Sequence, residues 1–469
     1  MTIGLTTRLW QQLWQALRND AAPEVHFTGA QRLVSAFPVT ELAATSMALA
    51  MQAAATLTGN ASRQRVDMRL ASRWFQQTFQ PVNRAAPSLW DAFAGDYAAA
   101  NGWIRLHTNA PHHRAAMEKV LGTHASRADL AHAVSRWDKT ALEQAIIDVG
   151  GCAAEMRSVE AWQQHPQGQS VRREPLIAQS LQPQAAAPDW PLPGLRPLKG
   201  VKVLDLTRII AGPVATRFLA GLGADVLRLD PPGWQEPTLE EEITLGKRCA
   251  RLDLKSATGR RIFEQLLSQA DVLIHGYRAD ALSALGYDEV TRQKLSPGLT
   301  DVSLNAWGWT GPWRNRRGFD SLVQMGCGIA DTGRQWQRSE KPVPLPVQAL
   351  DHATGYLMAA AALEGMRLRL QQGTGFSARL SLARTASLLT DYPYCDASQP
   401  EGLGQPQPHD TRVETEINAW GIGLRLKPPV QLAGMPLVWS ASASPLGAAS
   451  ATWRDQPVDS PSSSSFEPA

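Results

Sequence analysis

The sequence predicts an α/β protein built on a parallel sheet that is covered by helices on both faces. The first observation is an alternation, from Leu198 onward, of short apolar runs with helical patterns, which is typical of parallel strands joined by crossover helices. The second is a proline-dense break at 181–197, upstream of which the pattern is mostly helical. Ligands of such sheets bind beyond the carboxyl ends of the strands.

Five strands are predicted for this sheet, in chain order at 201–206, 226–229, 250–254, 272–275 and 299–304. A helix is predicted over 214–221, because Pro213 suits its first turn, and another over 257–269. Polar and aromatic residues directly follow the strands, where a ligand would bind: Arg208, Asp230, His275, Tyr277, Arg278 and Trp307.

The signatures of several common enzyme classes are missing from the sequence. No predicted strand is followed by a Gly-x-Gly-x-x-Gly loop, and Gly221-Leu-Gly223 stands at the end of a helix rather than at its start. P-loop, zincin and nucleophile-elbow motifs are missing too. Nicotinamide, P-loop, zinc-protease and α/β-hydrolase chemistry are therefore disfavoured.

Composition predicts a globular protein of two or three domains with a small-molecule ligand. The chain has 469 residues, of which 43% are hydrophobic, and its net charge of +3 comes without a long basic run, so nucleic acid is not an expected partner. Its four cysteines are scattered, which indicates free thiols and no metal site. Neither a signal peptide nor a membrane span is recognisable, so we expect a cytoplasmic location.

Between Leu198 and about Leu389, six segments resemble, in the same order, segments of the family III CoA-transferases (the CaiB/BaiF group). They are 198–213, 223–232, 246–255, 275–278, 318–324 and the segment that opens with Leu350-Asp-His-Ala-Thr-Gly355. Two positions depart from the family: Gly246 replaces an asparagine, and His275-Gly-Tyr-Arg278 stands where the family has Glu-Asn-Phe-Arg. The resemblance implies a Rossmann-like large domain with flanking helices, coenzyme A as part of the substrate, no metal, and a homodimer.

Upstream segments at 102–106, 114–121, 153–158 and 165–168 resemble the small α+β domain that follows the large domain in that family. The domain order is therefore rearranged here, with a partial first copy around 37–75. The expected organisation has five parts: a helix-rich N-terminal region at 1–180 that includes the small-domain-like segment at about 91–180, a linker at 181–197, the CoA-binding large domain at 198–395, an extension at 396–440 and a disordered tail at 441–469.

The resemblance places the nucleophilic carboxylate of the family at Asp351. A carboxylate can attack an acyl thioester to give a mixed anhydride, and the released thiolate can attack the anhydride to give an enzyme thioester. Asp351 lies between an apolar run and a predicted helix start, where negative charge is favoured. The plainer interpretation is that Asp351 is a helix N-cap, and the two roles are compatible.

Coenzyme A carries phosphates, and basic residues of the matching segments are candidates to bind them. These are Arg208, Arg228, Lys247, Arg248 and Arg278, since a guanidinium group forks onto phosphate oxygens and lysine offers a point charge. Tyr277 is a candidate to stack on adenine or to wall the acyl pocket. The alternative for each basic residue is an ordinary solvated surface.

These features predict a CoA-transferase that moves CoA between an acyl-CoA donor and a small carboxylic acid. Two alternatives stay open: an acyl-CoA racemase, isomerase or hydrolase on the same scaffold, and a catalytically silent CoA-binding protein. Racemases of this superfamily carry a histidine where this chain has Phe319, and a racemase needs a base on each face of the substrate, so transfer is favoured. Asp320 is expected to be structural.

Overall fold

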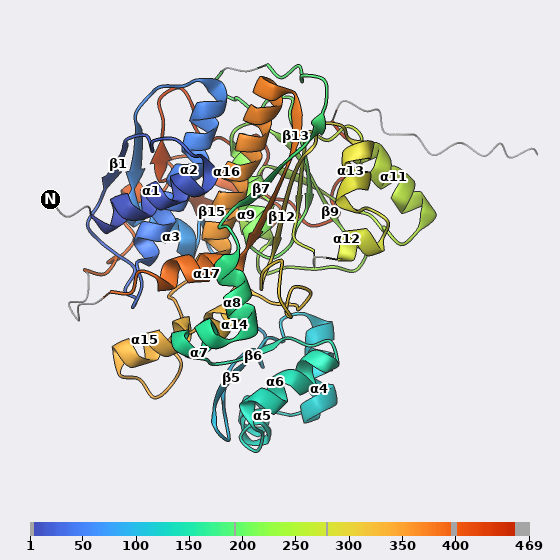
Figure 1. The fold of residues 1–469 in the computed structure, drawn as a ribbon. Helices are drawn as coiled ribbons and strands as arrows, with labels where there is room; N and C mark the ends of the chain where they lie inside the picture. The colour runs from blue at the N-terminus through green and yellow to red at the C-terminus, as the bar shows by residue number, and fades with distance from the viewer. Residues whose placement is uncertain (1–3, 192–193, 278–279, 395–400, 455–469) are drawn as a thin grey trace, which may run out of the picture.

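A seven-stranded sheet forms the centre of the large domain in this computed structural model, which describes residues 4–191, 194–277, 280–394 and 401–454 (Figure 1). Its strands, in spatial order, are β10 (Lys247–Arg251), β9 (Asp225–Asp230), β8 (Lys202–Leu206), β11 (Val272–His275), β12 (Thr300–Asn305), β13 (Thr374–Ser381) and β7 (Ala178–Gln184). Every neighbouring pair is parallel except β13 and β7, which are antiparallel. The predicted α/β fold is confirmed.

Alternate residues of the parallel strands supply the two faces of this sheet. In β8, for example, Val203 belongs to one buried cluster and Leu204 to the other. The face of Val203 is covered by α9 (Ala211–Gly221) and α16 (Ala349–Gln372). The face of Leu204 is covered by α11 (Ala257–Leu267), α12 (Ala281–Ala284) and α13 (Glu289–Leu295). Burial on both faces explains why consecutive apolar residues occur in β8 (Val203 and Leu204) and in β11 (Val272, Leu273 and Ile274).

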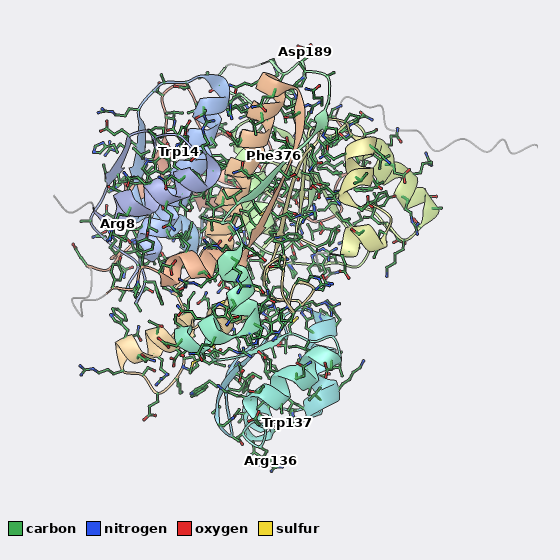
Figure 2. The ribbon with its side chains drawn as sticks, viewed as in Figure 1. Arg8, Trp14, Arg136, Trp137, Asp189 and Phe376 are labelled. Carbon is green, nitrogen blue, oxygen red and sulfur yellow. The ribbon has the colours of Figure 1, made fainter. Side chains whose placement is uncertain are left out.

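Helix α16 is buried along most of its length because α2 (Val39–Thr58) packs against the side that faces away from the sheet. Both helices are rich in alanine, so their backbones approach closely. Gly355 lets α16 approach α9 in the same way, since a Cβ there would lie 2.4 Å from the Ala211 carbonyl oxygen. The outer helices are α1 (Leu5–Leu17) and α3 (Met68–Gln76); Trp14 of α1, labelled in Figure 2, is 2% exposed.

The N-terminal region repeats part of the large domain. In chain order, α2, β2 (Gln64–Asp67) and α3 follow one another as α16, β13 and α17 (Leu382–Thr390) do. In the first unit, β2 has a parallel neighbour, β1 (Val25–Thr28), and an antiparallel one, β16 (Val430–Gln431). In the second unit, β13 has β12 as its parallel neighbour and β7 as its antiparallel one. The two units therefore share both element order and strand directions.

The two units also begin their first helix in the same way. The N-cap residues Pro38 of α2 and Gln348 of α16 both have φ −75°, with ψ values of 63° and 64°. Counted from these caps, Glu41 in α2 stands where Asp351 stands in α16. This repeat coincides with the partial first copy expected around 37–75, and it provides an internal comparison for the predicted nucleophile.

A small domain lies beside the carboxyl ends of the parallel strands (Figure 1). Its antiparallel sheet consists of β4 (Gly95–Ala99), β5 (Gly102–Leu106) and β6 (Ala153–Glu155). Its helices are α4 (Pro111–Leu121), α5 (Arg127–Val134) and α6 (Lys139–Asp148), which share a separate core with the sheet. The connection to the large domain contains α7 (Val159–Gln164), α8 (Pro166–Arg173), α14 (Asp320–Gly326) and α15 (Ile329–Gln337). A small α+β domain accompanies the large one, and the bounds of about 91–180 stay a prediction.

The proline-rich segment 181–197 is not entirely a linker. Its first residues belong to β7, where Leu181 pairs with Phe376 of β13. Because β7 is an edge strand, the missing N–H of Pro183 breaks no ladder hydrogen bond inside the sheet. Proline density alone could not separate an edge strand from an extended linker.

The expected disordered tail begins later than predicted. Within 441–454 the backbone packs on the sheet edge: the Ala449 N–H donates to the Cys249 carbonyl at 2.9 Å, and the Trp453 indole donates to the Leu266 carbonyl at 3.2 Å. Trp453 is fully buried. The prediction for 441–454 is therefore wrong, because one tryptophan supplies the apolar area that the composition lacks. Residues 455–469 lie outside the described residues.

The remaining elements connect the N-terminal region to the segment after residue 400. β3 (Phe79–Pro81) pairs with β15 (Gly421–Arg425), which pairs with β14 (Glu416–Asn418). The short helices are α10 (Glu240–Ile243) and the 3₁₀ turn Pro408–Asp410. Across the described residues, no helix has both the length and the apolar character needed to span a membrane. The thiols of Cys152, Cys249 and Cys327 are free and buried, and Cys395 lies outside the described residues.

Candidate active site

Asp351 is the third residue of α16, and its carboxylate does not cap the helix. The N-cap is Gln348, and the N–H of Asp351 donates to Oδ2 of Asp320 at 2.9 Å. Asp351 is 7% exposed, and nothing in the described ranges donates a hydrogen bond to its carboxylate. The interpretation of Asp351 as a simple N-cap is therefore wrong, and its carboxylate is available for chemistry.

Asp320 and Asp351 together determine the charge at this helix start. Asp320 is fully buried and also accepts a hydrogen bond from the Gln324 side-chain amide. Burial and the charge of Asp320 raise the pKa of Asp351 well above its usual range. Burial likewise raises the pKa of Asp320. Two carboxylates this close do not ionise independently, so the pair releases its second proton at a higher pH than an isolated carboxylate would.

The turn between β8 and α9 lies next to Asp351 in a strained conformation. Ile209 has φ +66°, which is unusual for a β-branched residue, and its N–H donates to Glu236 Oε1 at 2.7 Å. Arg228 holds Glu236 in place, since its Nη2 donates to Glu236 at 2.6 Å while its Nε donates to Asp230 at 2.8 Å. Arg228 is fully buried, so it stabilises this turn and does not fit the predicted phosphate contact.

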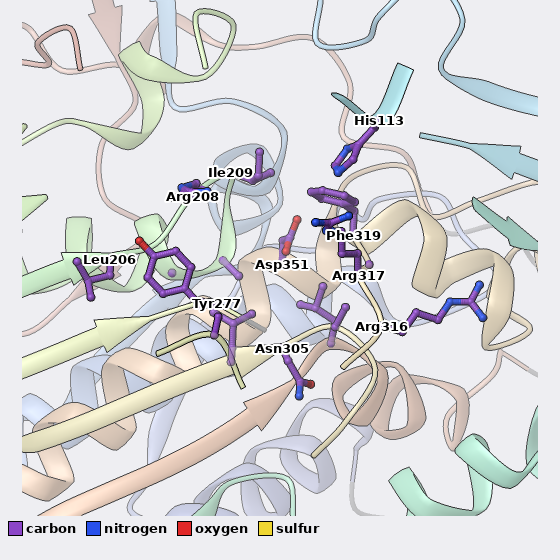
Figure 3. Close-up of a pocket in the computed structure, with 18 of the residues that line it drawn as sticks. His113, Leu206, Arg208, Ile209, Tyr277, Asn305, Arg316, Arg317, Phe319 and Asp351 are labelled. Carbon is purple, nitrogen blue, oxygen red and sulfur yellow. The ribbon is translucent and has the colours of Figure 1, made fainter. Parts of the chain in front are cut away.

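A cavity of about 380 Å³ opens beside Asp351 at the carboxyl ends of β8 and β12. Figure 3 shows the Asp351 carboxylate near its centre, with Arg208 and Tyr277 on one side and Phe319 and Arg317 on the other. Its cations distinguish it, and we call it the arginine cavity, lined by Arg208, Arg316, Arg317, Trp234, Tyr277 and Asp351. Its position agrees with the ligand site expected of a parallel sheet.

Two of the predicted coenzyme-binding residues meet in the arginine cavity. The Arg208 guanidinium lies 4.5 Å from the centroid of the Trp234 ring and 5.2 Å from that of Tyr277. Its closest carboxylate is that of Asp230, at 4.0 Å, and the Arg208 side chain is 26% exposed. Arg208 is thus oriented by two rings but keeps donors that a phosphate could accept from.

The other predicted basic residues do not join this cavity. Lys247 is buried, with its Nζ 3.1 Å from Asp205 Oδ2 and 3.0 Å from the Pro213 carbonyl oxygen, so it is a core residue. Arg248 pairs at 3.1 Å with Asp225, which begins β9, so it lies at the opposite end of the sheet. The predicted phosphate contacts of Lys247 and Arg248 do not fit this geometry. Arg278 lies outside the described residues.

A second cavity, of about 570 Å³, also reaches Asp351, and the small domain forms one of its walls. We call it the aromatic cavity, lined by Leu89, Trp90, His107, Trp234, Phe319 and Asp351. Phe319 lines both cavities and contacts the small domain. Its ring stacks on that of His107, with centroids 3.9 Å apart and planes 11° apart. His112 contributes to both cavities.

The contribution of the small domain was missed at the level of sequence. The resemblance placed a small domain at about 91–180, but no spacing or motif indicated which of its loops faces Asp351 or that Trp90 lines a cavity. The one sequence signal for this contribution is the rearranged domain order. A small domain that has moved to another place in the chain must still cover the same edge of the sheet. Arg317, immediately before the matching segment 318–324, was missed as well.

The fold and the site define a class: an α/β protein with a carboxylate buried where two cavities meet at the carboxyl edge of a parallel sheet. Residues 198–419 match the model of CoA-transferase family III. The match covers slightly less than half of the chain, and it agrees with the resemblance found in the sequence.

Three relatives illustrate the match. Acetyl-coenzyme A transferase nodX of Hypoxylon pulicicidum is 35% identical over 43% of this chain and 36% of its own length. Succinyl-CoA:glutarate CoA-transferase of Mus musculus is 32% identical over 39% of this chain and 44% of its own. Formyl-CoA:oxalate CoA-transferase of Escherichia coli O81 is 28% identical over 40% and 47%. The chain therefore spans less than half the length of each of these relatives.

Proposed function

We propose that the chain is a CoA-transferase that moves CoA from an acyl-CoA donor to a carboxylic acid acceptor, with Asp351 as the nucleophile. The observation that carries this proposal is the Asp351 carboxylate, which is buried, accepts no hydrogen bond from the described residues and faces two cavities. The names of the relatives, which are transferases of CoA or of acetyl-CoA, support the same reaction class.

The reaction proceeds by exchange at the Asp351 carboxylate. Its oxygen attacks the thioester carbonyl of the donor, a C–O bond forms, the C–S bond breaks, and CoA leaves as a thiolate. The thiolate attacks the aspartyl carbonyl of the anhydride, which gives an enzyme–CoA thioester and releases the carboxylate of the donor. The acceptor carboxylate then attacks this thioester, and the expelled thiolate takes the acceptor acyl group from the new anhydride. Asp351 is regenerated and no net proton is consumed.

Burial of Asp351 serves this chemistry in two ways. The apolar side chains around it, including Ile209 and Phe319, limit the access of water to the anhydride. Loss of hydration also makes the carboxylate a stronger nucleophile once it is ionised, since the same burial that raises its pKa raises its basicity.

The CoA moiety is proposed to occupy the arginine cavity and a neighbouring cavity of about 290 Å³. The two share Arg208 and Tyr277, and Lys255 lines the outer one. Arg208 and Lys255 offer charge to phosphates, while Tyr277 offers a ring to the adenine. Lys255 was not among the residues predicted from sequence.

The small domain that reaches Asp351 belongs to the same chain, because His112 of α4 and Asp351 of α16 line both the arginine cavity and the aromatic cavity. Residues of a second subunit are therefore not needed to bring a small domain to Asp351. The homodimer implied by the resemblance stays a prediction.

The proposal is tested by trapping the covalent enzyme. After incubation with a panel of acyl-CoAs and hydroxylamine, mass spectrometry is expected to find a hydroxamate on Asp351 in the wild type and none in Asp351→Ala. Glu41→Gln is the matched control, because Glu41 occupies the equivalent helix position but pairs with Arg32 at 2.9 Å, and its variant should keep the adduct. Acyl-CoA binding without any adduct would contradict the proposal and favour the proton-exchange or silent alternatives.

Replacing Arg208 by glutamine is expected to weaken acyl-CoA binding. The loss of a charge-assisted contact to phosphate should raise KM for acyl-CoA by about 10-fold or more and change kcat by less than about 3-fold. Arg248→Gln is the control, because it also removes a partly exposed guanidinium but lies at the other end of the sheet. Steady-state kinetics of both variants decide the matter: equal effects at the two positions would refute the placement of CoA.

A further inference from the structure

We propose that the aromatic cavity holds the acyl group, accepts monocarboxylic acids with an apolar or aromatic body, and rejects acids with a second carboxylate. This inference rests on the proposed CoA transfer at Asp351 and names its substrate class. The two cavities meet at Asp351, so CoA and the acyl group must extend into different ones. Arg316 is paired with Glu143 at 3.0 Å, but Arg208 and Arg317 give the arginine cavity cations for phosphates, which leaves the aromatic cavity to the acyl group.

The size and the walls of the aromatic cavity suit an apolar body. Trp90 of the small domain and Trp234 of the large domain line it together with Leu89, Ile210 and Phe319. Its volume is about 570 Å³, whereas a cavity of about 150 Å³ already binds benzene. A ring or a branched chain beyond the reacting carboxyl group can therefore be buried against aromatic walls.

The charge of the aromatic cavity opposes a second carboxylate. Among the described residues that line it there is no lysine or arginine, and its ionisable acids are Asp91, Glu236 and Asp351. His107 and His112 do not supply the missing cation, because burial lowers the pKa of both, that of His107 to about 3, and leaves them neutral near pH 7. A distal carboxylate would lose its hydration here without gaining a partner.

The nearby arginines are paired with carboxylates, and Arg114 lies 3.6 Å from Asp91 itself. The Arg228 guanidinium is committed to Asp230 and Glu236. Arg105 pairs with Asp96 at 2.7 Å and lies behind Trp90, 4.7 Å from its ring centroid. The relatives named for glutarate and oxalate act, by those names, on dicarboxylic acids. This chain is therefore expected to differ from them in its acceptor.

The test compares two thioesters of equal length, hexanoyl-CoA and adipoyl-CoA, which differ only in the terminal carboxylate. For the wild type, kcat/KM for transfer is expected to be at least about 100-fold higher with hexanoyl-CoA. Leu89→Arg places a cation at the cavity rim, where Leu89 is 51% exposed, and should raise the adipoyl value about 10-fold, which lowers the ratio of the hexanoyl value to the adipoyl value. Leu195→Arg, at a 65% exposed leucine outside both cavities, should change neither value.

The outcomes separate the two proposals. If adipoyl-CoA reacts as well as hexanoyl-CoA in the wild type, the assignment of the aromatic cavity fails while CoA transfer at Asp351 stands. If Leu89→Arg leaves the adipoyl value unchanged although the variant folds and turns over hexanoyl-CoA, the acyl group does not extend into this cavity. If neither thioester yields an acyl-enzyme or a product, the proposed function fails and the inference fails with it.

Discussion

Asp351→Asn is expected to abolish CoA transfer and, at the same time, to stabilise the fold above neutral pH. A carboxamide of the same shape cannot form the anhydride, so kcat/KM should fall by roughly 1,000-fold or more. The gain in stability follows from burial. The pKa of Asp351 is raised in the folded protein, so ionising it opposes folding, and asparagine removes that opposition.

The sign of the stability effect depends on pH. Below the pKa of an unfolded aspartate, Asp351 is protonated in both states and contributes no difference. As pH rises towards and beyond the raised pKa of the folded state, the unfolded chain binds fewer protons than the folded one, and the wild type loses stability relative to Asp351→Asn. Urea unfolding at pH 5 and pH 8 should therefore give a larger advantage of the variant at pH 8.

Glu41→Gln is again the matched comparison for stability. Glu41 stands at the equivalent position of α2 and is paired with Arg32 and hydrogen-bonded by Tyr394 at 2.9 Å, so its loss leaves these partners unsatisfied. Since Arg32 and Tyr394 are partly buried and Glu41 itself is buried, that variant should be less stable than the wild type at both pH values and should retain transfer. An Asp351→Asn protein that is destabilised equally at pH 5 and pH 8, or that keeps full activity, would refute the role assigned to Asp351.

The parts of the site that sequence could predict are those encoded locally. The position of Asp351 beside a cavity follows from a short segment at a helix start, and Arg208 and Tyr277 follow closely after strands whose apolar runs are recognisable. In a parallel sheet, the end of a strand is also the edge that binds ligands. At these residues, the local sequence pattern is therefore enough to predict their place at the ligand-binding edge of the sheet.

Burial of the basic residues could not be predicted, because it depends on partners that are distant in the sequence. Lys247 is neutralised by Asp205, 42 residues away, on a neighbouring part of the same sheet. Arg228 is balanced by Glu236 in a loop whose position is set by the strained turn at Ile209. The sequence around Asp205 and Glu236 does not show that these residues form internal ion pairs. A cation beside a strand looks the same in the sequence whether it pairs with a buried carboxylate or binds a phosphate.

The arrangement of the N-terminal region could not be predicted for the same reason: its partners are distant in the sequence. The alternating pattern after Leu198 predicts the sheet, but the repeat of α2, β2 and α3 is completed by β16, which comes near the end of the described chain. Pairing over such separations leaves no periodicity to detect. The internal repeat nevertheless explains why an alanine-rich segment near the start of the chain is as fully buried as the helix that bears Asp351.

Asp320→Asn is expected to move the pH dependence of acyl-enzyme formation towards lower pH. The charge of Asp320 contributes to the raised pKa of Asp351, and asparagine removes that charge while keeping an oxygen that can accept the Asp351 N–H. The nucleophile then ionises at a lower pH, and the acid limb of single-turnover kcat/KM should shift down by on the order of one pH unit.

Two further variants separate this electrostatic role from a structural one. Asp320→Ala also removes the acceptor of the Asp351 N–H, so it should lower stability by about 1–3 kcal/mol and reduce the rate across the whole pH range. Asp331→Asn removes another mostly buried carboxylate, which pairs with Arg334 in α15, and should leave the acid limb in place. A limb that does not move in Asp320→Asn, or that moves to higher pH, would show that Asp320 does not control the ionisation of Asp351. The shift expected here would instead identify the carboxylate pair as the device that sets the pH at which the nucleophile becomes reactive.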